Sequence, residues 1–425
     1  MGIRVLVVGG GGREHAIVWK LHRSTRVDEI ICAPGNPGIA KIAECVDIPV
    51  TDLPALVDLA RSGAVDLVVV GPEDPLANGL ADMIEDAGIP VVGPRAAAAR
   101  LESSKSFAKE IMEAAGVPTA RSITVTDHDA GIAAIQEIGG GGPVVVKADG
   151  LTAGKGVVVA PTTDEAIAAL DAFLIDRTMG DAGTSVVIET FLQGPEVSVL
   201  ALTDGTTIYP LAPSCDYKRA FDNDEGPNTG GMGVYTPTRL MDDAILAQVR
   251  ETILQPVIDE MRHRGTPMRG ILYAGLILTA SGPQVLEFNC RFGDPETQVV
   301  LPTLNADLGV LLEAVANGTL ADVPAPTASG VAVGVILASG GYPVSYPKGL
   351  PISGLDDVDD EDTIVFHAGT ARNSAGQIVT NGGRVLNVVA LGNDIASARA
   401  RAYAAADRIT FDGLQRREDI ALREA

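Results

Sequence analysis

The sequence predicts an α/β protein with a doubly wound N-terminal domain, a larger core that carries a mobile flap, and a small α+β C-terminal domain. Three observations lead to this prediction. Buried-type strands alternate with helices over the first quarter of the chain. Glycines are concentrated at 139–142 and 150–156, and a Pro/Ala/Gly-rich linker at 320–330 precedes a last group of strands. A chain of 425 residues is long enough for about two to four domains.

The N-terminal domain is expected to span residues 1–104. Its strands lie in IRVLVVGG, VDEIICAP and AVDLVVV, and each is followed by a loop rich in Gly or Pro. Ligands of doubly wound sheets bind beyond the carboxyl ends of the strands, so the loops GGGGREHA, APGNPG and GPEDP should line one crevice. Residues 96–116 are expected to form one helix that stops at Gly116.

The core is expected to span residues 105–328, with the flap at about 123–192, because glycine clusters allow a hinge. Residues 212–233 read as one long, polar, Gly-rich loop, and residues 270–290 as a hairpin that turns at 281–283. The C-terminal domain is expected at 329–425, where three strand-like runs precede a helix.

Composition limits the classes of function. A net charge of −23 argues against a nucleic-acid-binding surface, which normally carries a basic patch. The four cysteines are far apart and form no C-x-x-C pair, which argues against disulfides and structural zinc and fits a reducing cytoplasm. The N-terminal apolar run is too short to span a membrane. We therefore expect a cytoplasmic monomer that binds neither nucleic acid nor membranes.

Three polar residues form a row in LEFNCRFGDPETQ, residues 286–298. In a strand, Glu287, Asn289 and Arg291 would share one face, while the side chains of 286, 288, 290 and 292 would form an apolar face. A half-solvated antiparallel sheet commonly carries such a row. The row also suits chemistry, because carboxylate and amide oxygens bind Mg²⁺ and an arginine fork can hold a carboxylate or phosphate.

Two glycine loops resemble nucleotide-binding motifs without matching them. In GGGGREHA the position of the third glycine of a dinucleotide fingerprint holds Glu14, so a turn at a helix N-terminus beside Arg13 remains, either a phosphate cradle or a plain tight turn. In GLTAGKG the spacing is one residue short, and Gly156 replaces the Ser/Thr of a P-loop. The failed match leaves one alternative, in which this loop is a flexible flap that closes Lys155 over a triphosphate.

Single charged residues give weaker signals. Lys147 ends an apolar strand, where an unpaired cation is costly, so a phosphate partner is favoured. Lys105 by itself reads as a solvated helix residue. Glu189 and Glu196 read singly as surface carboxylates, although a position between two domains would let residues 190–192 meet an adenine edge and Glu196 a ribose. The histidines form no pattern typical of a catalytic triad.

Taken together, these motifs resemble the glycinamide ribonucleotide synthetase family of ATP-grasp enzymes, end to end. The motifs that carry the resemblance are GREHA, APGNPG, VGPEDPL, KADGLTAGKGV, GPNTGGMG, EFNCRFGDPETQ, GGYP, FHAGT and TNGGRV. The resemblance implies an ATP-grasp core and a carbon–nitrogen ligase of purine biosynthesis. Such an enzyme phosphorylates the carboxylate of glycine to glycyl phosphate, and 5-phosphoribosylamine then displaces phosphate to give an amide.

The resemblance also implies roles for individual residues. Metal ligands for Mg²⁺, or Mn²⁺ in its place, would be Glu287 and Asn289. The ATP site would comprise Lys105, Lys147 and Lys155 at the phosphates, Glu189, Phe191 and Leu192 around adenine, and Glu196 at the ribose. Glycine and 5-phosphoribosylamine would meet Gly12, Arg13, Asn36, Glu73, Asp216, Lys218, Asn228, Thr229 and Arg291. Arg291, Lys147 and Asp216 would be catalytic.

The chain departs from the family pattern at a few positions. Ser103, Cys215 and Tyr217 stand where the family shows EGSK and SQDHKR, and GGGREHA replaces NGGREHA. Leu276 stands where many ATP-grasp relatives carry a second metal-binding Glu, so a single metal site is expected. Alternatives are an ATP-grasp ligase with another amine or acid, a nicotinamide-dependent oxidoreductase, and a non-catalytic nucleotide sensor.

Overall fold

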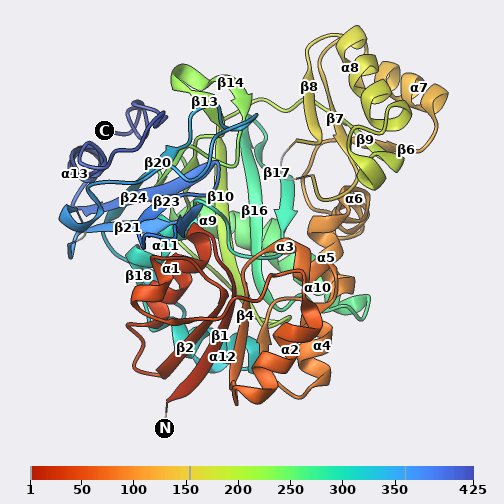
Figure 1. Ribbon diagram of the computed structural model, residues 1–425. Coiled ribbons are helices and arrows are strands. Elements are labelled where there is room, and N and C mark those ends of the chain that lie inside the picture. Colours follow the sequence, from red (N-terminus) through yellow and green to blue (C-terminus); the bar gives the residue numbers. More distant parts are fainter. Residues whose placement is uncertain (1, 153–154, 359) are drawn as a thin grey trace.

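The computed structural model describes residues 2–152, 155–358 and 360–425. Two residues of the expected flap loop, Ala153 and Gly154, lie outside this range. Four parts of the chain can be followed in Figure 1: an N-terminal sheet, an outlying antiparallel lobe, a central antiparallel sheet and a sheet that contains the C-terminal strands. Among the described residues, every helix is too short or too polar to span a membrane.

A five-stranded parallel sheet forms the N-terminal domain, in the order β3-β2-β1-β4-β5. Its strands are β1 (Ile3–Gly9), β2 (Val27–Pro34), β3 (Glu44–Cys45), β4 (Leu67–Val70) and β5 (Val91–Val92). Its helices are α1 (Gly12–Leu21), α2 (Leu53–Ser62), α3 (Glu73–Ala77) and α4 (Leu80–Asp86). Val5 and Val7 of β1 belong to one core, while Leu6 and Val8 belong to another on the opposite face. The doubly wound prediction is confirmed.

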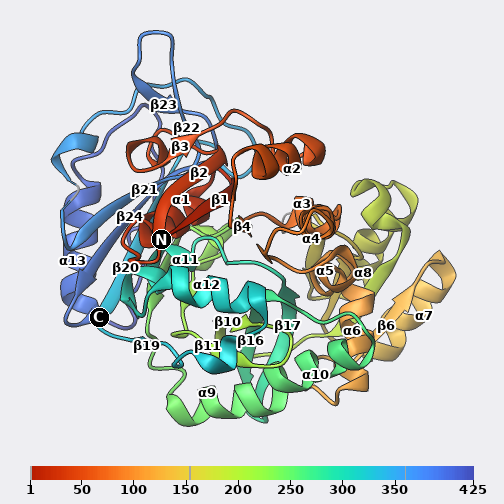
Figure 2. The ribbon, with the colours of Figure 1, turned by 90° about the horizontal axis from the view of Figure 1, so that it is seen from below.

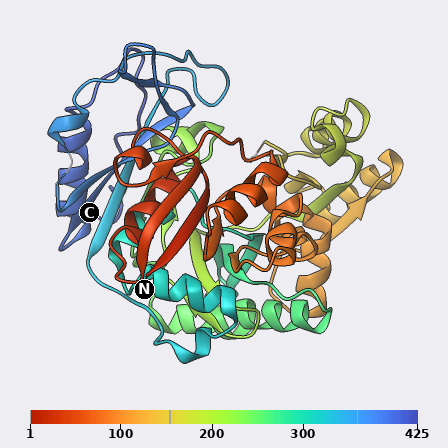
Figure 3. The same ribbon diagram turned by 60° about the horizontal axis from the view of Figure 1, so that its bottom comes forward.

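The prediction of one long helix at 96–116 is wrong, because the structure has two helices there. Ser104 adopts an extended conformation with φ of −139°, and it separates α5 (Ala96–Ser103) from α6 (Lys105–Ala114). Its side-chain oxygen accepts the N–H of Phe107 at 3.2 Å and so caps α6. The break turns the chain from the N-terminal domain toward the outlying lobe, which Figure 3 shows at the right.

The outlying lobe, which we call the flap lobe, comprises residues 122–190. Its antiparallel sheet has the order β6-β9-β7-β8, and two helices cover it. The elements are β6 (Ser122–Val125), α7 (His128–Gly139), β7 (Val144–Ala148), β8 (Val157–Ala160), α8 (Thr163–Leu170) and β9 (Val186–Thr190). The lobe has an apolar core of its own, which includes Val146, Leu170 and Ile188. It therefore stands as a separate packing unit beside the central sheet (Figure 1).

The central sheet is antiparallel, in the order β11-β10-β16-β17. Its strands are β10 (Glu196–Thr203), β11 (Ile208–Pro210), β16 (Gly270–Thr279) and β17 (Gly282–Asn289). The surrounding helices are α9 (Asp243–Val249), α10 (Gln255–His263) and α12 (Leu308–Asn317), and Figure 2 shows α9 and α10 along the outer edge. The short helix α11 (Thr297–Thr303) packs against α1 instead. The expected hairpin is confirmed, although Thr279 pairs with Gly282, so the turn residues are Ala280 and Ser281 rather than 281–283.

The fourth sheet has the order β12-β15-β20-β24-β21 and joins the core to the C-terminal strands. Its elements are β12 (Cys215–Asp216), β15 (Gly233–Thr236), β20 (Val331–Ala338), β21 (Thr363–His367), β24 (Arg384–Gly392) and the covering helix α13 (Ile395–Ala406). The strand pairs outside it are β13 (Arg219–Phe221) with β14 (Glu225–Asn228), β18 (Leu304–Asn305) with β19 (Thr327–Ala328), and β22 (Thr370–Arg372) with β23 (Ile378–Thr380). The prediction of a single loop at 212–233 is therefore wrong, because β12, β13 and β14 form within it and β15 begins at its last residue.

Short helical turns complete the element list. They are η1 (Ile39–Lys41), η2 (Asp171–Ile175), η3 (Gly180–Thr184), η4 (Asp222–Asp224), η5 (Arg250–Leu254), η6 (Leu320–Asp322) and η7 (Leu355–Asp357).

Candidate active site

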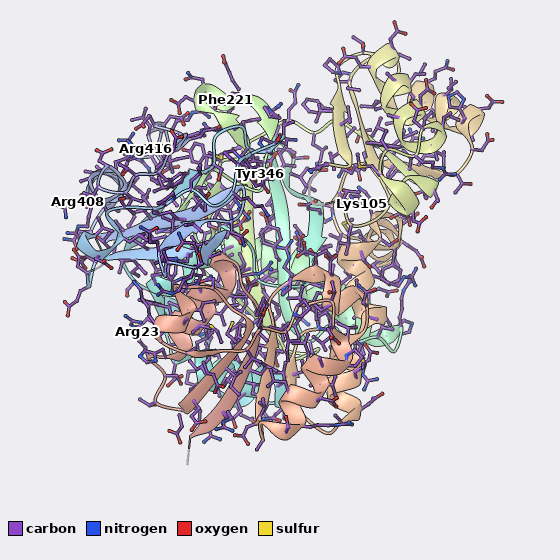
Figure 4. All side chains as sticks on the ribbon, in the orientation of Figure 1. Arg23, Lys105, Phe221, Tyr346, Arg408 and Arg416 are labelled. Carbon is purple, nitrogen blue, oxygen red and sulfur yellow. The ribbon has the colours of Figure 1, made fainter. Side chains whose placement is uncertain are left out.

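The residues proposed for chemistry gather where the N-terminal sheet, the flap lobe and the end of β17 meet. Arg13 of α1 donates to the carbonyl of Phe292 at 3.2 Å, and Lys147 of the flap lobe donates to the carbonyl of Leu286 at 3.1 Å. Figure 4 shows Lys105 at the junction between the flap lobe and the body. Segments more than a hundred residues apart thus converge on residues 286–292.

A β-bulge shapes the polar row on β17. Gly275 pairs with Glu287 and Leu276 with Val285, so Leu286 is an extra residue without a partner on β16. The apolar face consequently contains Val285, Phe288 and Cys290 in one core, whereas Leu286 is only half-buried and Phe292 belongs to another core. The prediction that residues 286, 288, 290 and 292 form one apolar face is therefore wrong at Leu286 and Phe292.

Three lysines and one glutamate form what we call the lysine cluster: Lys105, Lys109, Lys147 and Glu189. Glu189 is buried, and its two carboxylate oxygens lie 2.8 Å from Lys147 Nζ and 3.1 Å from Lys109 Nζ. The single-residue interpretation of Glu189 as a surface carboxylate is therefore wrong, and Lys147 has a protein partner where a phosphate was favoured. A buried cation is tolerated here because a buried anion faces it.

The lysines of this cluster differ in their free hydrogen-bonding capacity. Lys109 donates to Thr119 Oγ1 at 2.8 Å, to the carbonyl of Ala120 at 2.9 Å and to Glu189, which uses all three ammonium protons. Lys147 uses two of its protons, on Glu189 and Leu286. Lys105 donates to the carbonyl of Gly150 at 2.8 Å. It is half-buried, and burial lowers its pKa, which corrects the interpretation of Lys105 as solvated.

Glu287 and Asn289 offer oxygen ligands at the edge of the lysine cluster. Desolvation by the surrounding protein opposes ionisation of Glu287, but the positive charges of Lys218 and Lys147 outweigh it and lower the pKa of this exposed carboxyl. The Asn289 side-chain oxygen accepts from Arg291 Nη2 at 3.1 Å and keeps a second lone pair. Within the described residues there is no group of three or more His, Cys, Asp or Glu side chains that could hold a metal ion.

An arginine network occupies the N-terminal side of the site: Arg13, Arg291, Glu14, Glu73 and Glu102. Arg291 lies 3.1 Å from Glu73 and 2.9 Å from Glu102, and Arg13 lies 2.6 Å from Glu14 and 3.7 Å from Glu73. Burial opposes ionisation of Glu73, but Arg291 and Arg13 outweigh it and lower its pKa. Each guanidinium is thus already neutralised by protein carboxylates.

The N-terminal loops hold the predicted substrate residues Gly12 and Asn36. A Cβ on Gly12 would lie 2.6 Å from Gln298 Nε2, so a larger residue would displace the end of the Gln298 side chain. The Asn36 side chain donates to the carbonyls of Gly10 and His367, both at 2.9 Å, and accepts the N–H groups of Gly38 and Ile39. All four hydrogen bonds of this amide are used, so Asn36 ties the loop to β21.

A second group of predicted residues surrounds β12. Glu196, exposed at the start of β10, forms an ion pair with Lys218, and burial of Lys218 is outweighed by Asp216 and Glu196, which raise its pKa. Burial raises the pKa of Asp216. Thr229 donates its N–H to the carbonyl of Lys218 at 2.7 Å, and Asn228 lies exposed on β14.

The remaining predicted ATP residues lie around the flap lobe. Phe191 and Leu192 lie on the connection from β9 to β10, with Phe191 exposed and Leu192 half-buried. Lys155 is exposed in the turn before β8, where its N–H donates to the carbonyl of Thr152 at 3.0 Å.

Sequence reasoning missed three residues of this site: Lys109, Glu102 and Glu296. Glu102 accepts the N–H of Cys290 at 2.7 Å as well as pairing with Arg291. Glu296 is buried and accepts from Tyr273 Oη at 3.1 Å, and burial together with Asp216 raises its pKa to about 7. The sequence offered only a weak indication of Lys109, as a lysine on the inner side of α6. It offered none for the two acids, because their partners are remote in sequence.

The flap lobe thus brings Lys147 beside Glu287, an exposed carboxylate on the edge strand of the central sheet. The fold is shared with the biotin carboxylase domain of 2-oxoglutarate carboxylase from Hydrogenobacter thermophilus: the match covers 98% of this chain and 92% of that one with a TM-score of 0.74, and at 18% identity it shows the fold alone. The chain belongs to the phosphoribosylglycinamide synthetase family, whose N, ATP-grasp (A) and C domain models match residues 3–102, 103–297 and 332–423. It is therefore an ATP-grasp carbon–nitrogen ligase.

Close relatives extend over the whole chain. The phosphoribosylamine–glycine ligase of Streptomyces coelicolor is 51% identical over 430 residues, which is 100% of both chains. The trifunctional purine biosynthetic protein adenosine-3 of Gallus gallus is 48% identical and matches 100% of this chain with 42% of its own length. The crystal structure of phosphoribosylamine–glycine ligase from Thermotoga maritima has 32% identity and a TM-score of 0.85, with 99% of this chain and 100% of that one covered.

Proposed function

We propose that the protein ligates glycine to 5-phosphoribosylamine at the expense of ATP, giving glycinamide ribonucleotide, ADP and phosphate in purine biosynthesis. The full-length identity to enzymes named for this reaction supports the substrates. The main support is the hydrogen bond from Lys147 to the carbonyl of Leu286, because it brings a flap-lobe cation beside the row of Glu287, Asn289 and Arg291.

The lysine cluster would bind the nucleotide. Lys105 and Lys147 keep ammonium protons for phosphate oxygens, whereas Lys109 is fully used in fixing Glu189. Lys155 would reach the phosphates from the flap lobe, Phe191 and Leu192 would border adenine with Glu189 behind them, and Glu196 would meet the ribose. Phosphoryl transfer depends mainly on such positioning and charge neutralisation.

A divalent cation fits Glu287 and Asn289. One carboxylate and one amide oxygen match the way Mg²⁺ is held, since it retains waters and takes its other ligands from substrate phosphates. We propose Mg²⁺, with Mn²⁺ as a substitute. When bound, the ion would offset the negative charge that develops on the transferred phosphoryl group.

Arg291 would hold glycine and the acyl phosphate made from it. A glycine carboxylate oxygen attacks the γ-phosphorus of ATP, and the bond from that phosphorus to the ADP oxygen breaks. To form a bidentate contact with glycine, Arg291 must loosen its pair with Glu73, the more exposed of its two acidic partners, with 29% of the side chain exposed against 7% for Glu102.

The amine would approach from the N-terminal loops and β12. Gly12, Arg13, Asn36 and Glu73 would shape one side of its pocket, and the other side would be formed by Asp216, Lys218, Asn228 and Thr229. Its nitrogen attacks the acyl carbon, the carbon–oxygen bond to phosphate breaks, and phosphate leaves with that electron pair while the nitrogen gives up a proton. Closure of the flap lobe would exclude water, which would otherwise hydrolyse the acyl phosphate.

The test is a reaction with Mg²⁺-ATP, glycine and freshly generated 5-phosphoribosylamine, in which ADP release and the mass of the amide product are followed while each component is omitted in turn. We expect product only when all three substrates are present. ADP release with a different amine or acid would overturn the substrate assignment. ATP binding without turnover would favour the nucleotide sensor.

We further propose that the protein works as a monomer in the cytoplasm. The reactants are small molecules, and the residues assigned to them all come from one chain. Sedimentation of the purified protein at several concentrations would test the monomer, and a mass that rises to that of a dimer would contradict it.

A further inference from the structure

A short segment after α13 packs against β13, the η4 turn and Tyr217, beside Asp216 and Lys218. We call residues 416–424 the latch segment. Its Arg417 is fully buried, with 0% of the side chain exposed. The guanidinium donates to the carbonyl of Arg219 at 3.2 Å and to Asp224 Oδ1 at 3.0 Å, and it lies 4.7 Å from the centre of the Tyr217 ring. One side chain thus touches both ends of the 217–224 stretch.

Backbone contacts reinforce this packing. The N–H of Ala421 donates to Tyr217 Oη at 2.9 Å. The N–H of Glu418 donates to Asp222 Oδ1 at 2.8 Å, and the N–H of Asn223 donates back to Asp419 Oδ2 at 2.9 Å. The latch segment therefore holds β13, the η4 turn and the residue that precedes Lys218.

Tyr217 links the latch segment to the proposed substrate residues. It lies between Asp216 and Lys218, and its backbone exchanges hydrogen bonds with Gly233 at 2.9 Å and Met232 at 2.7 Å. β12 is only two residues long, so its own ladder fixes it weakly. The Tyr217 side chain is held by the N–H of Ala421 and by the guanidinium of Arg417.

We propose that Tyr217 and Arg417 are positioning residues, through which the latch segment fixes Asp216 and Lys218 for the anionic amine substrate. This inference rests on the proposed function, because it assigns that substrate to the Asp216–Lys218 pair. Lys218 supplies the positive charge for a phosphate group, and its position depends on the backbone that Tyr217 anchors. Of the residues proposed for ATP, Glu196 pairs with Lys218 and so lies beside this region, whereas the lysine cluster is formed by α6 and the flap lobe.

The test compares Tyr217→Phe and Arg417→Met with the wild type. Tyr217→Phe removes only the hydroxyl that accepts from Ala421, and Arg417→Met removes the cation while keeping much of the volume. We expect the KM for the amine to rise about tenfold, the change equivalent to one lost hydrogen bond to a charged or buried group. The KM for ATP should stay within about twofold, since no contact to the lysine cluster changes. Arg417→Lys should recover part of the loss.

Arg416→Met is the matched control. Arg416 is adjacent in sequence but pairs with Asp407 and Glu418, and it forms no hydrogen bond or ion pair with the described residues 215–224. Figure 4 labels it in the upper left part of the view. This variant should leave the KM for the amine unchanged. An equal rise for Arg416→Met and Arg417→Met, or an equal rise in the KM values for ATP and the amine, would overturn the proposal.

Hydrogen exchange separates failure of this inference from failure of the proposed reaction, because it needs no turnover. In Arg417→Met, amides of residues 215–233 should exchange faster while those of the flap lobe stay unchanged. Faster exchange with an unaltered KM for the amine would show that the latch segment is structural only. If the amides of residues 215–233 exchanged at the wild-type rate in Arg417→Met, this would contradict the proposal that the latch segment anchors them.

Discussion

The lysine cluster and the arginine network are built from similar charges but in opposite balance. In the lysine cluster, Lys109 and Lys147 share the buried carboxylate Glu189, and Lys105 donates to the carbonyl of Gly150. In the arginine network, two guanidinium groups are surrounded by Glu14, Glu73 and Glu102. The first region has positive charge left over for a triphosphate, whereas the second is neutral and can take an anion only by releasing one of its own acids. The difference separates a site that attracts its ligand from one that exchanges partners.

The largest effect is expected from loss of Glu287, the proposed metal ligand at the edge of the lysine cluster. Glu287→Gln removes the only carboxylate among the proposed metal ligands, so turnover should fall about 1,000-fold, equivalent to several kcal/mol of transition-state stabilisation. Turnover should be measured at saturating ATP, with the far-UV circular dichroism spectrum as a check of the fold. Glu251→Gln, on the exposed face of η5, is the control. Normal activity in a folded Glu287→Gln variant would remove Glu287 from the site.

The arginine network offers a direct comparison of its two acids. Glu102 is the more buried partner of Arg291, so Glu102→Gln should lower the free energy of unfolding by about 3 kcal/mol, because it leaves a buried guanidinium undercompensated. Glu73→Gln should cost less than about 1 kcal/mol, since Glu73 is partly solvated. Urea denaturation of both variants measures the difference. The reverse order of stabilities would mean that Glu73, not Glu102, fixes Arg291.

Glu296 provides a pH test next to the same network. Its folded-state pKa of about 7 exceeds the ordinary 4.5, so the folded state binds this proton more tightly than the unfolded chain. The stability that it contributes is therefore present at low pH and is lost as the pH rises from 4.5 to 7. The difference in unfolding free energy between wild type and Glu296→Gln should fall by about 2 to 3 kcal/mol across that window. A constant difference would show that Glu296 ionises normally.

The smallest effect distinguishes two lysines of the lysine cluster. Lys147→Met should raise the KM for ATP about tenfold, because Lys147 keeps a free ammonium proton for a phosphate oxygen. Lys109→Met should change it less than about threefold, since all its protons are used within the protein. Equal effects in steady-state kinetics would show that charge alone, not free hydrogen-bonding capacity, determines ATP affinity.

The sequence predicted the order of elements and the polar row well, because both depend on local periodicity. The strand–helix alternation of residues 1–104 and the hairpin of β16 and β17 follow from short-range patterns of burial and turn residues. Ser104 and the bulge at Leu286 were missed, because one residue that leaves the regular conformation changes little in the pattern.

The charge pairs were beyond sequence reasoning for a different reason. Glu102 and Arg291 are 189 positions apart in numbering, and only packing of α5 against β17 brings them to 2.9 Å. Glu189 read as a surface carboxylate because its two lysine partners lie on α6 and β7. The residue roles stay predictions that the proposed experiments address, and the domain limits at 104 and 328 also stay predictions.

The transfer of oxygen from glycine to phosphate tests the central claim most directly. The protein would be incubated with Mg²⁺-ATP, 5-phosphoribosylamine and glycine labelled with ¹⁸O in both carboxylate oxygens, and the inorganic phosphate would be analysed by mass. We expect each phosphate to carry one ¹⁸O, because the attacking carboxylate oxygen stays on phosphorus when the acyl–oxygen bond breaks. Unlabelled phosphate formed along with the amide would contradict the acyl phosphate route and the role of Arg291 in holding it.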